Sequence, residues 1–237
     1  CYPVAGYPLG VKAKWEPVQE GSGTPSLENI RPIKGRDSVT ITRQEDNQVI
    51  TLTLPTTIYG GEVDAVAGEG QETRKLVTLD GTETWYTWGV NANNSAVTGF
   101  YTYDINDYDA KNVKGICSNL PHPDGDTWGG RNSGIGFATV GSSRYFMYCI
   151  PTAILADVSD NSAAIASLKS YLAAQYAAGT PVQVCYKLVE PVPFTATGAQ
   201  PIPALAGANT VLTDADSATV TGRADPIKRI ADLENKE

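Results

Sequence analysis

The fold is decided by two alternating runs in the last third of the chain, Gly179-Thr-Pro-Val-Gln-Val-Cys-Tyr-Lys-Leu-Val-Glu-Pro-Val-Pro-Phe-Thr195 and Thr210-Val-Leu-Thr-Asp-Ala-Asp-Ser-Ala-Thr-Val-Thr-Gly-Arg223. In the first run, Val182, Val184, Tyr186 and Leu188 fall on one face of an extended chain, because successive side chains of a strand alternate. The pattern predicts half-buried strands at 181–188 and 210–222. It specifies no chemistry.

Similar short runs precede this stretch at intervals of about ten residues, separated by Gly, Asn and Asp turns. We predict strands at 9–15, 38–43, 48–54, 62–67, 74–79, 85–103 (interrupted by a turn at 91–95), 113–118, 135–140 and 144–150. A long Gly- and Pro-containing loop, 19–35, follows the first strand, and a loop of this length is usually functional or packed on the surface as a lid. This spacing predicts an all-β, jelly-roll-like β-sandwich rather than βαβ units.

One packed α-helix is predicted at about 161–178. Asn161 or Ser162 is the expected N-cap, and Ile165, Leu168 and Leu172 recur at helical spacing. Gly179 supplies the left-handed residue that ends the helix. Asp225 and Pro226 indicate the start of a C-terminal helix in residues 224–237.

Composition narrows the classes of function. The 237 residues include 18 Lys plus Arg against 26 Asp plus Glu, a net charge of -8, which disfavours nucleic-acid binding. No apolar run approaches the roughly 18 residues of a membrane-spanning helix, so membrane insertion is not expected. The chain begins at Cys1, which we interpret as a fragment or a processed product; a lipoprotein would also begin at Cys. The four widely spaced cysteines predict free thiols and no metal site.

Catalytic groupings are sparse. A Ser-His-acid triad would have to use the lone histidine, His122, for which no local partner is evident. Asp104, Asp107 and Asp109, or Asp124 and Asp126, offer carboxylate pairs for glycoside cleavage, although clustered loop acids are more often solvated turn residues. The Asp124-Gly125-Asp126 segment also suits Ca²⁺ through its oxygens, but the full calcium-loop pattern is absent. We therefore expect no catalytic residues and no cofactor.

Aromatic residues suggest a different chemistry, because their flat faces match the apolar faces of pyranose rings. The aromatic candidates are Trp85, Tyr86, Trp88, Trp128 and Tyr145. Trp85 and Trp88 are an odd number of residues apart, so they should point to opposite faces of a strand, and at least one should be core. Trp128 is surrounded by loop residues on both sides, and it serves either as a ligand contact or as a loop anchor.

Several segments, taken in order, resemble minor structural proteins of tailed bacteriophages of gut bacteria. They are Trp15-Glu-Pro-Val-Gln-Glu-Gly-Ser-Gly-Thr-Pro-Ser-Leu-Glu-Asn-Ile-Arg-Pro-Ile-Lys-Gly35, Tyr59-Gly-Gly-Glu-Val-Asp64, Tyr171-Leu-Ala-Ala-Gln175 and the closing segment 208–225. The middle, roughly 85–159, matches least and has the character of a variable region.

The resemblance implies a virion structural module at the tail tip, baseplate or fibre that binds other virion proteins and assembles in the host bacterial cytoplasm. It carries over no catalytic residues. We expect one β-sandwich domain over 1–223 and the start of an assembly or docking helix over 224–237. The alternatives are a tail-associated polysaccharide-degrading enzyme, a capsid decoration or head-fibre protein, and a bacterial carbohydrate-binding module.

Two sites follow as hypotheses. In the loop 119–134, Trp128 would stack on a host cell-surface sugar while hydrogen-bonding side chains hold its hydroxyls; these are Asp124, Asp126, Arg131 and Asn132. At the C-terminal end, Ile227, Ile230 and Leu233 form a narrow apolar stripe that suits a short coiled coil or a docking helix, with a frayed tail as the alternative. The resemblance to fibrous phage parts favours a homotrimer.

Overall fold

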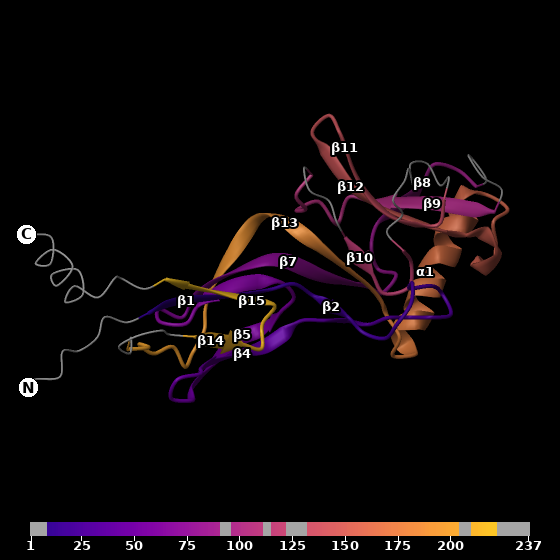
Figure 1. Cartoon of the computed structure of the whole chain (residues 1–237). Helices are drawn as coiled ribbons and strands as arrows, with labels where there is room; N and C mark the ends of the chain where they lie inside the picture. Colours follow the sequence, from indigo (N-terminus) through magenta and orange to yellow (C-terminus); the bar gives the residue numbers. More distant parts are fainter. Residues whose placement is uncertain (1–8, 91–95, 111–114, 122–131, 204–209, 222–237) are drawn as a thin grey trace, which may run out of the picture. The chain divides into compact units, whose positions relative to one another are not determined.

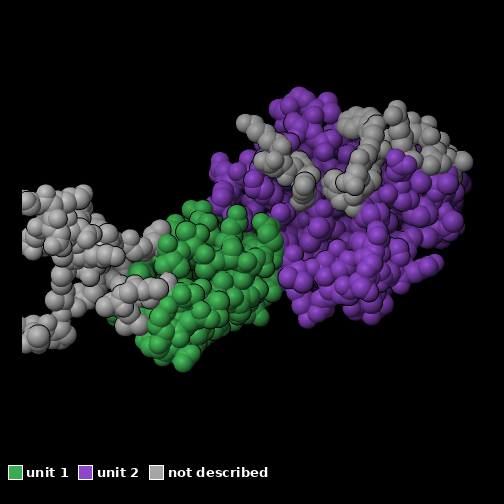
Figure 2. Space-filling model, in the orientation of Figure 1, with its two compact units in different colours: residues 1–16, 35–72, 192–237 green, residues 17–34, 73–191 purple. Residues whose placement is uncertain are grey.

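The described part of the chain is all-β with one α-helix, as predicted. The structure, a computed structural model, describes residues 9–90, 96–110, 115–121, 132–203 and 210–221. They divide into two compact units (Figure 2): unit 1 comprises 1–16, 35–72 and 192–237, and unit 2 comprises 17–34 and 73–191. The sequence predicted a single domain over 1–223. In the structure, each unit has its own hydrophobic core. Strands β7 (Glu69–Leu79) and β13 (Val182–Thr195) contribute residues to both units.

Unit 1 is built from curled antiparallel strands (Figure 1). They enclose a core that is aliphatic apart from Trp15. One layer follows the order β7-β6-β1-β15 and the other the order β14-β4-β5. The strands other than β7 are β1 (Gly10–Trp15), β4 (Arg36–Arg43), β5 (Gln48–Ile58), β6 (Gly61–Asp64), β14 (Val211–Thr213) and β15 (Ser217–Thr221). In β1, Val11, Ala13 and Trp15 are buried and alternate with exposed lysines, which confirms the period of two.

The predicted strand at 210–222 is in fact two strands with a turn between them. Asp214 accepts a hydrogen bond from the amide of Thr40 (2.8 Å) and Asp216 accepts one from the amide of Glu16 (2.7 Å). Aspartate side chains that bind backbone amides compete with a β ladder, so the two aspartates end β14 and precede β15.

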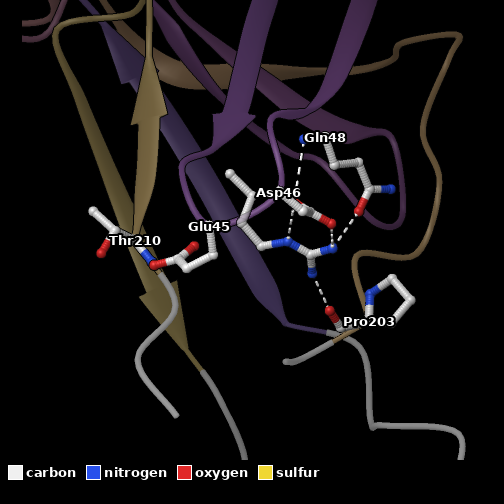
Figure 3. Close-up of polar contacts among 6 residues, drawn as sticks. Glu45, Asp46, Gln48, Pro203 and Thr210 are labelled. Carbon is white, nitrogen blue, oxygen red and sulfur yellow. Dashed lines mark hydrogen bonds and ion pairs between the residues drawn. The ribbon is translucent and has the colours of Figure 1, made fainter. Parts of the chain in front are cut away.

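A buried arginine fastens the β4–β5 turn of unit 1 (Figure 3). The guanidinium of Arg43, only 4% exposed, donates to both carboxylate oxygens of Asp46 (2.9 and 2.6 Å), to the side-chain oxygen of Gln48 (2.7 Å) and to the carbonyl of Pro203. The hydrogen bond from Arg43 is the main influence that holds the pKa of Asp46 at about 2. The turn and the segment around Pro203 are therefore tied to one cation.

Unit 2 contains a four-stranded antiparallel sheet in the order β11-β12-β9-β8, together with the helix. The sheet strands are β8 (Trp85–Thr87), β9 (Val97–Thr102), β11 (Gly134–Val140) and β12 (Ser143–Pro151). The short elements are β2 (Val18–Gln19), β3 (Ile33–Lys34), β10 (Ile116–Cys117) and the 3₁₀ helix η2 (Thr152–Ile154). The core is rich in aromatic residues: Trp85, Phe100, Tyr108, Phe146, Tyr148 and Tyr186.

The helix, α1 (Asn161–Ala177), is docked on the core of unit 2 as predicted. Leu168 and Leu172 are fully buried, and Ile165 packs against the same core. The N-cap is Asp160 rather than Asn161 or Ser162, because its carboxylate accepts from the amide of Ala163 (2.8 Å), a partner three residues on.

The helix ends as predicted at Gly179, which has a φ of 76°. The amide of Gly179 donates to the carbonyl of Tyr176 (3.1 Å), and the amide of Thr180 donates to that of Gln175 (3.1 Å). These two bonds form a Schellman motif, in which a residue in the left-handed conformation satisfies the last carbonyls of the helix.

The loop between β2 and β3 is held by Arg31. Its guanidinium donates to the carbonyls of Glu20 (2.7 Å), Gln19 (3.0 Å), Gly21 (2.9 Å) and Gly23 (2.5 Å). The amide of Arg31 also donates to the carbonyl of Ser118 (2.6 Å). This Gly-rich loop is therefore held on the surface of unit 2.

The predicted C-terminal helix, with Ile227, Ile230 and Leu233, lies outside the described residues, so the assembly hypothesis stays a prediction. In the part of the chain that is described, no helix combines the length and the apolar character needed to cross a membrane.

Candidate functional site: an aromatic face on the four-stranded sheet

The predicted ligand loop is only partly described. Asp124, Asp126, Trp128 and Arg131 lie outside the described residues, as does His122, while Asn132 is an exposed residue two positions before β11. At the start of the loop, Asn119 is not a surface residue: it is buried, and its amide nitrogen donates to the hydroxyls of Tyr148 (3.0 Å) and Tyr171 (3.2 Å). Asn119 therefore belongs to the core, and the Trp128 hypothesis stays a prediction.

Trp85 and Trp88 lie on opposite faces of the four-stranded sheet, as their odd spacing predicted. Trp85 is 4% exposed and packs in the core against Phe146 and Tyr148, with ring centroids 6.4 and 6.2 Å away. Trp88 is half-buried and contacts Tyr101 and Tyr145, at 4.7 and 6.3 Å. Trp85 is thereby assigned to the core, and Trp88 belongs to a second aromatic group.

That second group covers the face of β8, β9 and β12 opposite the core, and we call it the aromatic face. Its members are Tyr86, Trp88, Tyr101, Tyr103 and Tyr145. Tyr86 and Tyr101 are directly opposed across β8 and β9, and their rings stack at 5.3 Å with an angle of 20°. The ring of Tyr103 stands edge-on to that of Tyr101, at 5.8 Å and 90°. Adjacent strands thus bring four tyrosines and a tryptophan into one continuous cluster.

The outer rings of this cluster are accessible. Tyr86 and Tyr103 are each 42% exposed, and Tyr101 is half-buried between them, whereas Tyr145 is 5% exposed. Burial, followed by the neighbouring Tyr103 and Tyr86, raises the pKa of Tyr101, and burial is also the main influence that raises the pKa of Tyr145. Both rings are therefore neutral phenols at physiological pH, so the face combines apolar ring area with uncharged hydroxyl groups.

Tyr108 supports the aromatic face from the core side of the sheet. Its buried hydroxyl accepts from the amide of Tyr145 (3.2 Å) and donates to the carbonyl of Ala138, which is opposite Tyr145 in the β11–β12 ladder. Arg144 donates to the Tyr108 carbonyl (3.1 Å), and its guanidinium carbon lies 5.9 Å from the Tyr108 ring centroid. Tyr108 and Arg144 therefore fix the backbone that carries Tyr145.

The acids that the sequence offered as a catalytic pair are engaged in structural contacts. Asp107 accepts from Lys75 (2.7 Å) and from the hydroxyl of Tyr186 (2.6 Å), and Asp109 pairs with Lys187 (2.9 Å). Burial opposes ionisation of Asp107, but the bonds from Lys75 and Tyr186 prevail and lower its pKa.

Asp104, the third of these acids, accepts from the amide of Thr84 (2.7 Å). The general acid of a glycosidase pair has a raised pKa so that it can donate a proton, and the lowered pKa of Asp107 does not suit that role. These aspartates fasten loops to strands.

The described cysteines are structural. Cys117, Cys149 and Cys185 are buried free thiols, as predicted. Burial raises the pKa of the Cys117 thiol to about 11, so the thiol is protonated and unsuited to nucleophilic attack. Within the described ranges, no group of three or more His, Cys, Asp or Glu side chains is arranged to hold a metal ion.

Unit 1 has a surface hollow of about 540 Å³. Its charged lining combines Lys12 with Glu62, Asp64 and Glu69. Its aromatic residue, Phe194, packs on the unit 1 core and lies over Gly70. The hollow therefore combines mixed surface charges with one half-buried aromatic ring.

Sequence reasoning found three of the five residues of the aromatic face, Tyr86, Trp88 and Tyr145, and missed Tyr101 and Tyr103. A signal was present, because Tyr101 and Tyr103 alternate with Phe100 and Thr102, and both of the latter are buried. The alternation assigns the tyrosines to one face, but it cannot say that this face is accessible.

Comparisons of the chain with protein-family models, with curated proteins and with solved structures found no match.

Proposed function

We propose that this chain is a non-enzymatic structural module of a tailed-phage virion, at the tail tip or fibre, and that it binds a host cell-surface glycan through the aromatic face. The observation that carries the proposal is the cluster of Tyr86, Trp88, Tyr101, Tyr103 and Tyr145 on the non-core side of one sheet. Tyr145 is buried within this layer, but Tyr86 and Tyr103 stay 42% exposed, so the layer keeps aromatic area in contact with water, and exposed apolar patches often mark binding sites.

The ring geometry supports a sugar as the ligand. Aromatic side chains offer large contact area at small entropic cost, and tyrosine adds a hydroxyl that can donate or accept. A pyranose has the matching combination, an apolar face of C–H groups and a rim of hydroxyls. The virion assignment rests on the resemblance of the segments around 15–35, 59–64 and 171–175 to tail proteins, and a homotrimer assembled through Ile227, Ile230 and Leu233 remains part of the proposal.

The test compares retention of the protein on host cell-wall glycans for wild type, for Tyr86→Ala combined with Tyr103→Ala, and for Tyr176→Ala. Tyr176 is a suitable control because it is 56% exposed on α1, outside the aromatic face. We expect the double variant to lose retention by about tenfold or more, equivalent to about 1.4 kcal/mol, with Tyr176→Ala unchanged. Equal retention by all three proteins, with folds verified by circular dichroism, would contradict the proposal.

The same incubation tests the enzymatic alternative. Binding without release of soluble sugars is the expected result. Release of sugars would favour a polysaccharide-degrading enzyme, and imaging of the parent particle with a labelled chain would distinguish tail from capsid.

A further inference from the structure

We infer that the aromatic face selects uncharged glycan chains of at least two sugar units and rejects acidic ones. This inference rests on the proposed function and adds the class of ligand. It depends on the extent of the accessible rings and on the placement of charge around them.

The accessible rings cover more than one sugar. Tyr86, Trp88 and Tyr103 surround Tyr101, with ring centroids 5.3, 4.7 and 5.8 Å from its own. A single pyranose is about the size of one aromatic ring, so one sugar can stack on one member of this group and leave the others in contact with water. A chain of two or more units covers several rings at once, and the apolar area removed from water grows with each unit.

The strands that carry the face contain almost no charge. Among the residues of β8, β9, β11 and β12, one side chain is ionised, that of Arg144. Its guanidinium is committed to the carbonyl and the ring of Tyr108, which is fully buried in the core. Arg144 is therefore directed away from a ligand on the aromatic face, and these strands offer no cation to a carboxylate, sulfate or phosphate group.

At the edge of the face, the charges beside the start of β8 and the end of β9 are negative, those of Glu83 and Asp104; Glu83 accepts from the indole of Trp85 (3.1 Å). Asp104 follows Tyr103 directly, is exposed, and accepts from the amide of Thr84, the residue before β8. An anionic sugar bound on the rings would meet this carboxylate, and the four described strands offer no cation to compensate it. Like charges brought together oppose binding. The net charge of -8 acts in the same direction at longer range.

The chemistry of the exposed groups favours a glycan over a polypeptide as the occupant. The most exposed members of the face, Tyr86 and Tyr103, keep their hydroxyls beside the rings, and a sugar rim can pair with those hydroxyls. A polypeptide partner bound by this face would be captured equally well when all glycans are absent, and that result is one outcome of the test.

The test measures binding of the full chain to a glycan array with matched neutral and acidic members, including hydroxyethylcellulose with carboxymethylcellulose, methyl-esterified with de-esterified polygalacturonate, and length series from one to four sugars. We expect at least about tenfold tighter binding to neutral members and a rise in affinity from one to three units. Binding to neutral members should not change as NaCl is raised, because it involves no ion pair.

Asp104→Asn is the informative variant, because asparagine keeps an oxygen that can accept from Thr84 while removing the charge. It should strengthen binding to acidic members by about threefold at low salt and leave neutral members unchanged. Tyr176→Ala serves as the control, with no change expected for either class.

The outcomes distinguish the selectivity for neutral glycans from glycan binding itself. Equal or tighter binding to acidic members, or a flat length series, would overturn this inference and leave the proposed function standing. Absence of binding to every member of the array, or capture of a virion polypeptide on the face without glycan, would overturn both.

Discussion

The cores of the two units are built from different residues. In unit 1 the fully buried apolar residues are aliphatic apart from Trp15, and the polar feature is the Arg43 cluster at a turn. In unit 2 one sheet carries aromatic residues on both faces, with Trp85, Phe100 and Phe146 inside and Tyr86, Tyr101 and Tyr103 outside. The unit 1 core thus forms with a single large aromatic residue. Our proposal assigns the exposed part of the outer layer in unit 2 to ligand binding.

The largest effect should come from the inner face of the unit 2 sheet. Phe100→Ala removes a fully buried ring and should lower the free energy of unfolding by about 3 to 5 kcal/mol. Tyr86→Ala, on the outer face, should cost less than about 1 kcal/mol, since the ring is already in contact with water. Urea denaturation of both variants measures the contrast, and equal losses would mean that the outer face is a packing surface.

Next in size is the docking of α1. Leu168→Ala or Leu172→Ala should each cost roughly 2 to 4 kcal/mol through the cavity left in the unit 2 core. The matched control is Lys169, which lies between the two leucines in sequence and is half-buried. Lys169→Ala should change the melting temperature little. If neither leucine substitution alters the melting temperature, the buried leucines do not hold the helix on the core.

In unit 1 the corresponding test is Arg43→Met. The substitution keeps most of the apolar stem and removes the charge-assisted bonds to Asp46, Gln48 and Pro203, which should cost roughly 1 to 3 kcal/mol. Lys14→Met is the control, on an exposed position of β1 in the same unit. Amide hydrogen exchange should show reduced protection at the β4–β5 turn. Unchanged protection there would mean that Arg43 does not stabilise the turn.

The smallest effect is one of pH. The hydrogen bond from Arg43 holds the pKa of Asp46 at about 2, below the value of about 3.9 in an unfolded chain. Ionised Asp46 therefore stabilises the folded state above about pH 4, and this contribution is lost as the pH falls towards 2. The urea midpoints of wild type and Asp46→Asn should therefore converge as the pH falls from about 4 to about 2. A constant difference between the two midpoints would show that ionisation of Asp46 does not contribute to stability.

Much of the fold could be predicted because period-two and helical patterns depend on local geometry. The strand from Val182 and the ends of α1 near Asn161 and Gly179 follow from such patterns. The turn at Asp214 to Asp216 was missed because it depends on contacts with Thr40 and Glu16, distant in sequence. The division into two units was missed for the same reason. The sequences of β7 and β13 have ordinary strand patterns, which do not reveal that each strand contributes residues to both units. The aromatic face was half found, because periodicity separates Tyr101 from Phe100 but gives no measure of which side is open.

The Arg31 contacts bear on how this region can vary in evolution. Loops on a β scaffold usually accept insertions and deletions, because only their ends are fixed. Here the fixed points lie inside the loop, at the carbonyls of Gln19, Glu20, Gly21 and Gly23, all held by one planar group. An added or deleted residue between positions 19 and 23 would move an acceptor out of reach of the guanidinium. Divergence in this segment should therefore proceed by substitution at constant length, and the spacing from Gln19 to Arg31 becomes a marker by which distant relatives of this chain can be recognised.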